Sequence, residues 1–531
     1  LRKASHYYVA AGDRAADALA FDRAAHLYRE GLRYRRSGES QRDDLHVRLA
    51  DALANAGRGA EAAEEYRKAV YEAGTVRGID LRRKAAYQYC ISGHIEAGRA
   101  AMHDLLARYC GVKLPESRVG VVVSLLRNRF RLWMRSFDFK ERDVRDIPAE
   151  ELMRIDVLWS ASAGLSMSDI VLGAALQTYG LVEAMNCGEV YRVARSLSWE
   201  ATHVSNEGGP SWPRTQRLLD LAQEFAERSN HPHALGMAAM ARGIAEFTSG
   251  RWATAVPQLD HADALLRERC TNVAWELDTA HAFALWALIY KGDFGEMRRR
   301  SLALIKEAED RGDLYAYATL GTFHHPHAIL AADDDGTAAR DFLELSRSKW
   351  VTSGFYLQDL DGLMCDALID TYENDGARGY ERFRAFDGKV KASQLLRSQC
   401  IALLYYHFRA RAALNGAVNG RPELIRAAEA DAKRIDSQKV EWAKPYGRLI
   451  HAGVAIARGD GIRARALLRE SAEMLDRVNM FSHAASARLI LGEMTGGPEG
   501  EALQQKAHEF FDGQGIKNAR AMARLHMGAV S

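Results

Sequence analysis

Apolar residues recur along this chain at the spacing of one helix face, beginning within the first turns. Five of them, in the stretch 21–32, fall at i, i+3, i+4, i+7 and i+11, which places them on one side of a predicted helix. They are Phe21, Ala24, Ala25, Tyr28 and Leu32. A second set repeats the arrangement: Trp252, Ala255, Val256 and Leu259. The pattern predicts amphipathic helices rather than strands.

These helices form a unit that recurs: an apolar helix, a small turn with glycine, and a second amphipathic helix, as in "AIARGDGIRARALLRESAEML". From Gly209 onward the turn glycines stand 38 to 44 residues apart. The turn glycines are Gly57, Gly93, Gly209, Gly250, Gly292, Gly336, Gly376, Gly416, Gly459 and Gly497. One helical pair cannot bury its own apolar face, so neighbours must stack. The expected fold is all-α: an α-solenoid of tetratricopeptide-like helix-turn-helix repeats with a period near 40 residues.

The spacing is interrupted between Gly93 and Gly209, where the stretch 111–148 departs from the repeat. We interpret that stretch as an insertion or a joint between two sub-arrays. The expected organisation is N-terminal helical repeats at 1–110, a basic amphipathic insertion or joint at 111–148, and the main solenoid at 149–531 with capping helices at its end. Because the chain begins at Leu1 inside a helical pattern, we expect it to be part of something longer.

Composition agrees with this picture and excludes few functions. Ten prolines in 531 residues suit a helical protein, and a net charge of +2 carries no global nucleic-acid or membrane footprint. The six cysteines are far apart and form no CxxC pair, so we expect reduced, buried thiols. No leader and no long uncharged apolar run is present, which predicts a cytoplasmic protein.

Candidate catalytic motifs are not accompanied by the other motifs that their chemistry requires. Asp293-Phe294-Gly295 spells a kinase magnesium motif, but no glycine-rich loop or HRD element accompanies it, and Gly292 already fits the repeat spacing. We therefore interpret it as an inter-helix turn. "FDGKV" lacks the Ser or Thr of a phosphate loop. The histidines of "TFHHPHAIL" could line a helix end or, less favoured, bind metal. No catalytic, cofactor or metal residue is expected.

The insertion offers partner-binding candidates. Its "SRVGVVVSLLRNRFRLWMRSFDFKERD" is basic and amphipathic, and could lie on an anionic membrane, grip nucleic acid or dock on an acidic partner. The candidates are Arg127, Arg129, Arg131, Trp133 and Arg135. The favoured interpretation is a long helix that packs its apolar side on the solenoid while the arginines reach water, and partner docking comes next.

A second candidate is the aromatic-rich "SKWVTSGFYLQDLDGL", with Trp350, Phe355 and Tyr356. Large rings near a loop could line a groove for a peptide or small ligand. Core between repeats is the favoured interpretation.

Several stretches resemble a known family. "AAGDRAADALAFDRAAHLYREGL", "RERCTNVAWELDTAHAFALWALIYKGD" and the ending "FFDGQGIKNARAMARLHMG" look like the C-terminal tetratricopeptide-like region of large bacterial serine/threonine protein kinases that are fused to an AAA- or STAND-type ATPase. The resemblance covers nearly the whole chain and implies that Ser531 is close to a natural C-terminus. It implies ATP and magnesium only for domains upstream.

The expected function follows from the repeats, the missing motifs and the resemblance. We expect a non-catalytic solenoid that binds a protein, peptide or small-molecule effector and regulates the kinase and ATPase attached in cis. Nucleic acid and membrane are not expected partners. Two alternatives stay open: the sensor arm of an ATPase-type transcription activator, for which "ALQQKAHEFFDGQGIKNARAMARLHM" could imitate a helix-turn-helix, and an enzyme with a dispersed groove site.

Overall fold

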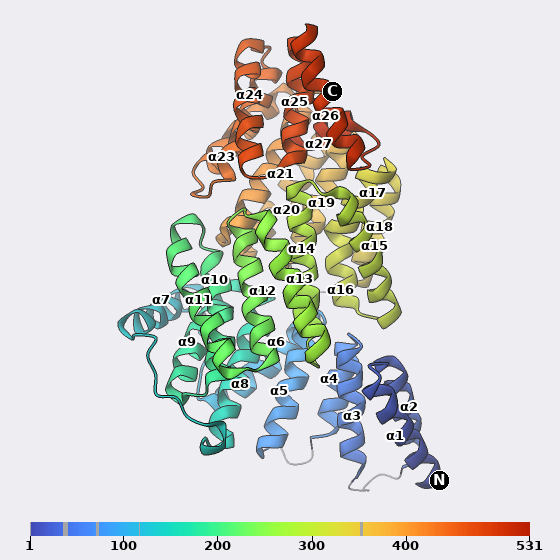
Figure 1. Ribbon diagram of the computed structural model, residues 1–531, viewed down its shortest axis with the longest axis vertical. Helices are drawn as coiled ribbons and strands as arrows, with labels where there is room; N and C mark the ends of the chain where they lie inside the picture. Colours follow the sequence, from blue (N-terminus) through green and yellow to red (C-terminus); the bar gives the residue numbers. More distant parts are fainter. Residues whose placement is uncertain (1, 36–40, 71–73, 116, 351–353, 531) are drawn as a thin grey trace.

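The chain folds into a long stack of helix pairs (Figure 1). The computed structural model describes residues 2–35, 41–70, 74–115, 117–350 and 354–530, so Leu1 and Ser531 lie outside the described residues. The described part contains helices and no strand, and most helices pack mainly on their neighbours along the chain. The expected all-α solenoid is confirmed.

The helices before and within the predicted insertion are α1 (Arg2–Asp17), α2 (Phe21–Arg33), α3 (Gln41–Asn55), α4 (Gly59–Lys68), α5 (Val76–Ile91), α6 (Ile95–Leu105) with the π-helical turn η1 (Leu106–Cys110), α7 (Arg118–Met134) and the short η2 (Val144–Asp146).

The helices of the middle part are α8 (Ala149–Ser166), α9 (Ile170–Cys187), α10 (Val190–Ser205), η3 (Gly209–Ser211), α11 (Trp212–Ser229), α12 (Pro232–Thr248), α13 (Trp252–Arg269), α14 (Ala274–Lys291), α15 (Phe294–Arg311), α16 (Leu314–Thr319), η4 (Leu320–His324) and α17 (His325–Asp333).

The remaining helices are α18 (Gly336–Lys349), α19 (Leu357–Tyr372), α20 (Gly376–Ser393), η5 (Leu395–Arg397), α21 (Gln399–Val418), η6 (Pro422–Leu424), α22 (Ile425–Asp436), α23 (Ala443–Ala457), α24 (Gly461–Arg477), α25 (Phe481–Thr495), α26 (Gly497–Gly513) and α27 (Ala519–Met527).

The helix faces predicted from apolar spacing form the core. Ala24, Ala25 and Tyr28 are buried on α2, and Trp252 and Ala255 are buried on α13. Alanine at such positions lets neighbouring helices approach closely. All six cysteines are unpaired, and all but the half-buried Cys270 are buried.

The turn that spells a kinase motif is an ordinary helix junction. Gly292 adopts a left-handed backbone (φ 86°) and ends α14, and Asp293 is the residue before α15. Phe294 opens α15 and is only 2% exposed, with its ring 5.5 Å from that of His327. The interpretation as an inter-helix turn is confirmed.

The glycine spacing is correct as a period but not at every residue. Six of the ten marked glycines carry a positive φ, and at three others the left-handed residue lies one or two positions before the mark. The tenth, Gly416, lies inside α21, and the left-handed residue follows four positions later. These four left-handed residues are Gly208, Asp334, Asn374 and Gly420. Asp and Asn tolerate this conformation because their short polar side chains bond locally, so the turns at Asp334 and Asn374 do not require glycine.

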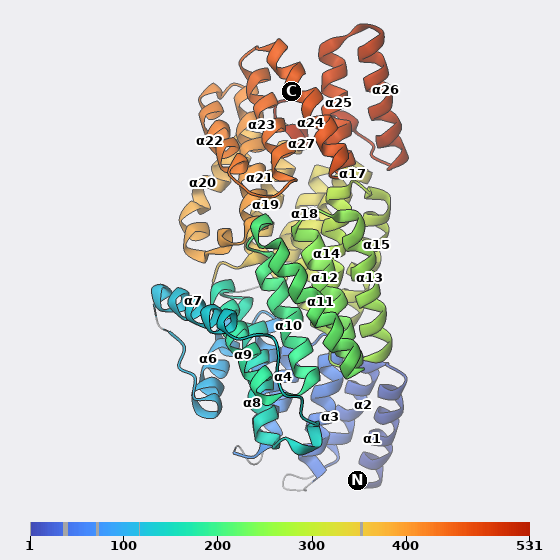
Figure 2. The same cartoon turned by 60° about the vertical axis from the view of Figure 1, so that its left-hand side comes forward.

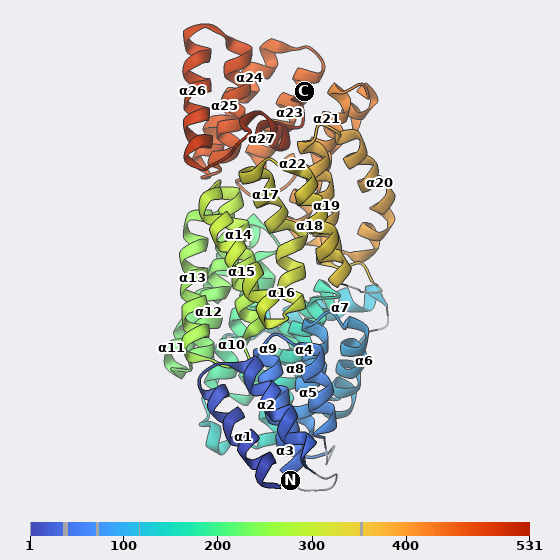
Figure 3. The same ribbon diagram turned by 90° about the vertical axis from the view of Figure 1, so that its right-hand side faces the viewer.

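The stack also winds back on itself, so that segments far apart in the sequence touch. Ser398 donates to the Asn206 side chain at 2.8 Å across 192 residues. Trp442 donates its Nε1 to the Thr248 carbonyl at 3.4 Å across 194 residues, and its ring lies 5.4 Å from that of Trp252. Figure 3 shows the resulting elongated molecule with its N- and C-termini at opposite ends. Successive superhelical turns are therefore in direct contact.

Candidate functional site

Helix α7 is set apart from the repeats and projects at the edge of the molecule in two views (Figures 1 and 2). Ser117 begins it by accepting a hydrogen bond from the Gly120 amide at 3.1 Å. Val121 and Leu132 are buried on its inner face. On the same face the Asn128 amide donates to the Ala175 carbonyl of α9 at 3.1 Å. This face fixes α7 on the solenoid.

The outer face of α7 carries a continuous apolar stripe. Six large apolar side chains on it are between 56% and 79% exposed. We call them the α7 seam: Val119, Val123, Leu126, Phe130, Trp133 and Met134. The rings of Phe130 and Trp133 stack on each other at 5.8 Å. Folded soluble proteins rarely expose a contiguous row of large apolar side chains, so this face is a candidate interaction surface.

The arginines of α7 divide into two groups. Arg118 donates to the Ala392 carbonyl at 3.0 Å, Arg129 pairs with Glu207, and Arg135 bonds Asn186, so these three hold the helix to the solenoid. Arg127 and Arg131 are exposed beside the seam and have no ion-pair partner among the described residues. The favoured expectation holds in part: apolar side chains pack inward and Arg127 and Arg131 reach water. It does not account for the second apolar face, which points outward, or for the three arginines that bond the solenoid.

The sequence analysis chose Trp133 and four arginines here as partner-binding candidates and did not choose the other five seam residues. The signal was present in their spacing of four, three, four and three residues from Val119 to Trp133. That spacing was hidden because buried Val121 and Leu132 lie in the same stretch and fill the other side of the helix.

The aromatic candidates at 350–356 lie in a contact between superhelical turns. Trp350 is buried against Gly93, where an added Cβ would come within 2.7 Å of its ring. The Tyr356 hydroxyl donates to Glu96 at 3.1 Å, and the Phe355 ring lies 6.0 Å from that of Phe386. The contacts of Trp350 and Tyr356 are therefore with α6 and the turn before it, and that of Phe355 is with α20.

The histidine group at 324–327 is buried and neutral. Burial lowers the pKa of His324 and of His327 to about 3, and that of His325 to about 4. The described residues contain no group of three or more His, Cys, Asp or Glu placed to hold a metal ion. The nearby Asp335 caps α18 by accepting from the Ala338 amide at 2.8 Å.

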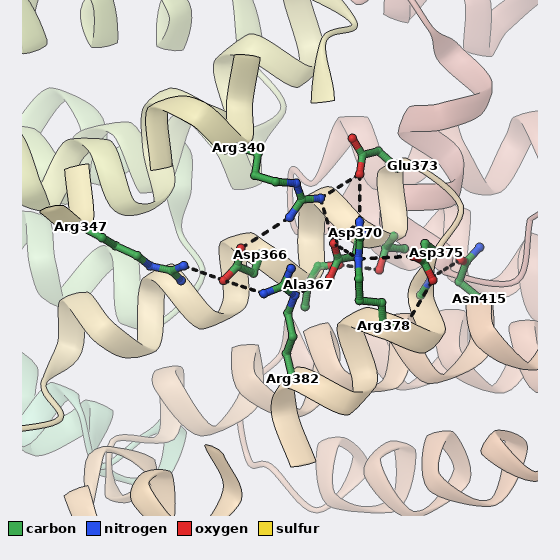
Figure 4. Close-up of polar contacts among 12 residues, drawn as sticks. Arg340, Arg347, Asp366, Ala367, Asp370, Glu373, Asp375, Arg378, Arg382 and Asn415 are labelled. Carbon is green, nitrogen blue, oxygen red and sulfur yellow. Dashed lines mark hydrogen bonds and ion pairs between the residues drawn. The ribbon is translucent and has the colours of Figure 1, made fainter. Parts of the chain in front are cut away.

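In the densest cluster of charges, the arginines and carboxylates pair with one another (Figure 4). Asp370 of α19, fully buried, accepts from Arg340, Arg378 and Arg382 at 2.7–2.9 Å. Asp366 pairs with Arg347 at 2.7 Å. The four arginines face four carboxylates, which are Asp366, Asp370, Glu373 and Asp375. Because the charges balance and are mutually bonded, this network joins α18, α19 and α20 rather than offering a ligand site.

The C-terminal stretch that could imitate a helix-turn-helix is packed inward. In α27 the residues Ala521, Met522, Ala523, Leu525, His526 and Met527 are buried. The helix lies against α19, α21 and α25. It therefore presents little side-chain surface to a groove of DNA.

Comparisons with known proteins suggest no function, so the inference of function rests on the geometry of the surface. No protein-family model matches the chain, and a search of curated proteins found no match. Among the described residues, no helix has both the length and the apolar character that crossing a bilayer requires.

Proposed function

We propose that this chain is a non-catalytic interaction and ligand-sensing solenoid that regulates an attached serine/threonine kinase and ATPase in a cytoplasmic bacterial signalling protein. The α7 seam is its partner-docking surface, and that exposed stripe is the observation that carries the proposal. The family resemblance of the sequence supports the kinase and ATPase as the attached domains.

The spacing of the seam favours a helix as its partner. Val119, Val123, Leu126, Phe130 and Trp133 follow the alternation of four and three residues that coiled-coil a and d positions show. This narrow stripe suits knobs-into-holes packing along one partner helix. Arg127 falls at the edge of the seam, where a coiled coil places the charged residues that select the partner. The partner helix should therefore carry carboxylates along that edge.

Pairing of α7 with a second copy of itself is disfavoured by charge. Arg127 and Arg131 are exposed beside the seam, and residues 118–135 include no Asp or Glu, so two such helices would bring these like charges together. An acidic amphipathic helix removes this repulsion and buries the seam in the same step.

The docking proposal can be tested with a designed probe. A synthetic helical peptide with leucine at a and d and glutamate at e and g should bind the chain in fluorescence anisotropy, whereas its lysine counterpart should not. Trp133→Ala should weaken binding by about 2 kcal/mol, the size of a buried aromatic anchor. Arg127→Glu combined with Arg131→Glu should reverse the preference, so that the lysine peptide binds.

Other outcomes would contradict the docking proposal. If neither peptide binds, or if both bind equally, a helix partner is ruled out for the seam. Binding of anionic vesicles that is lost in Trp133→Ala, with no peptide binding, would assign the seam to a membrane surface. The non-catalytic claim has its own test: phosphotransfer or ATP turnover above background by the purified chain would overturn it.

A further inference from the structure

A second candidate site lies where the N-terminal repeats meet the middle of the array. A cavity of about 410 Å³ opens between α5, α8, α10, the start of α12 and the loop before α14. Its volume falls in the range of about 300–1,000 Å³ that small-molecule sites occupy. The loop is tied to the N-terminal repeats because the Asn272 amide donates to the Asn55 side chain at 2.6 Å, across 217 residues.

The walls of the cavity are aromatic and cationic. Trp159, Tyr87 and Tyr191 line it, and each ring is buried or half-buried. The Arg195 guanidinium lies 4.5 Å from the centre of the Trp159 ring and 5.2 Å from that of Tyr191. A flat or apolar group entering the cavity would meet ring faces and a guanidinium plane.

Four buried side chains lining the cavity keep a polar atom with no protein partner. These atoms are the Tyr87 hydroxyl, Trp159 Nε1, Arg195 Nε and Glu276 Oε2. Each of the four side chains is at least nine-tenths buried. A buried polar group without a partner costs about 1–3 kcal/mol, so such groups in a native fold are normally satisfied by a ligand or ordered water. Three donors and one carboxylate oxygen in the cavity wall therefore have hydrogen-bonding capacity that the described protein residues leave unused.

The charges of the site are of both signs and close together. Glu276 lies 3.5 Å from His233, whose other ring nitrogen is 3.1 Å from the Tyr191 hydroxyl. Arg195 donates to that same hydroxyl at 3.4 Å. A short chain of contacts thus joins the buried carboxylate to the buried guanidinium across the cavity.

Most cations at the cavity wall already pair with a carboxylate, and only Arg269, exposed at the rim, has no ion-pair partner among the described residues. Arg195 bonds Asp156 at 2.8 Å, and Arg83 bonds Asp80 at 2.6 Å. Burial raises the pKa of Asp156, but three arginines outweigh that effect and hold the pKa below its usual value, so this carboxylate stays charged beside Arg195. A nucleotide triphosphate would need several unpaired cations. A ligand with one negative and one positive group matches the balance.

We propose that this cavity binds a small zwitterion with an apolar or aromatic side chain, of the chemical class of a free α-amino acid. Glu276 receives the ammonium group, Arg195 donates its Nε to the carboxylate, and Trp159 packs on the side chain. The bound molecule would contact α8, α10 and α14 at once, and would favour the arrangement of these repeats that fits it best. This goes beyond the proposed docking function, because the cavity and the α7 seam share no residue.

The test uses the intact chain and the amino acids themselves. A thermal-shift screen of the twenty L-amino acids, followed by calorimetry, should find binding for at least one with a large apolar or aromatic side chain. L-Phenylalanine is the reference probe, compared with 3-phenylpropionate, which lacks the ammonium, and phenethylamine, which lacks the carboxylate. Each analogue should bind at least tenfold more weakly than the amino acid.

Single substitutions test which side chains bind the ammonium and carboxylate groups of the amino acid. Glu276→Gln and Arg195→Met should each reduce affinity at least tenfold, while Glu268→Gln, on the exposed side of α13, should bind as the unsubstituted chain does. If a variant fails to fold, the two analogues still test the same contacts on the original protein. The proposal is overturned if no amino acid binds, or if 3-phenylpropionate binds as tightly as L-phenylalanine. Loss of peptide docking at α7 with retained amino-acid binding would contradict only the docking function.

Discussion

At the scale of single residues, glycines in the turns between helices allow a left-handed backbone, and some of them also allow close packing against the next superhelical turn. Gly250 adopts a left-handed backbone (φ 82°), and an added Cβ would lie 2.4 Å from Cδ1 of Trp442 in the next superhelical turn. Gly459 has a similar backbone (φ 74°), but nothing lies within 4 Å of its missing side chain. The two positions separate backbone conformation from close packing.

Gly459→Ala should lower the free energy of unfolding by about 1–2 kcal/mol, the cost of a left-handed conformation for a residue with a Cβ. Gly250→Ala should cost clearly more, because the Cβ also displaces the Trp442 ring. Urea denaturation of both variants measures the difference. Equal losses would mean that Trp442 moves aside without cost.

The buried histidines make the fold sensitive to acid. His327 is 3% exposed, both its ring nitrogens lack a partner, and its folded-state pKa is about 3 because of burial, aided by Arg411. Between pH 6.5 and about 3 the unfolded chain binds a proton that the folded chain does not. Stability contributed by the neutral histidine is therefore lost as the pH falls below 6.5.

His327→Leu should flatten the fall of unfolding free energy between pH 6.5 and pH 4.5 by up to about 1.4 kcal/mol per pH unit, the value of one proton. Urea titrations at several pH values measure the slope. His508→Leu, on the exposed side of α26, is the control and should leave the slope unchanged. An unchanged slope in His327→Leu would show that this histidine titrates normally.

At the scale of elements, charge networks fix how successive helices sit. Asp370→Ala would leave Arg340, Arg378 and Arg382 without their shared acceptor (Figure 4). Breaking a buried pair in this way costs about 3–5 kcal/mol, so the melting temperature should drop strongly. Glu381→Gln removes a carboxylate that pairs with exposed Arg384 and Arg421, and should change stability by less than about 1 kcal/mol. Calorimetry of both variants compares them; equal effects would contradict the structural role of the network.

The elements were largely predictable, but their partners were not. Local apolar spacing was enough to place helices such as α2 and α13, because the residues that form one helix face lie within about a dozen consecutive positions. The outward seam of α7 was misjudged because nothing local says which of two apolar faces meets the solenoid. The cavity was missed because Trp159, Arg195 and Glu276 come from three helices, although the carboxylates Glu276 and Asp278 in the largely apolar "NVAWELDTAHAFALWALIY" were a visible anomaly.

At the scale of the whole molecule, contacts between superhelical turns change how the array should unfold. In a simple solenoid each repeat contacts only its neighbours, so unfolding can begin anywhere and spread. Here Trp442 is 1% exposed and packs on Trp252 and the Thr248 carbonyl, nearly two hundred residues away in sequence. Such contacts couple the middle of the chain to its C-terminal part.

Trp442→Ala should therefore do more than lower stability by the about 3–5 kcal/mol expected for a buried tryptophan. It should divide one calorimetric transition into two, because the repeats before and after the contact would no longer melt together. Trp133→Ala, which removes an exposed ring of equal size, should keep a single transition. If Trp442→Ala still melts in one step at a lower temperature, the coupling between halves must run through the neighbouring repeats, and the contacts between superhelical turns would then stabilise the array without making it cooperative.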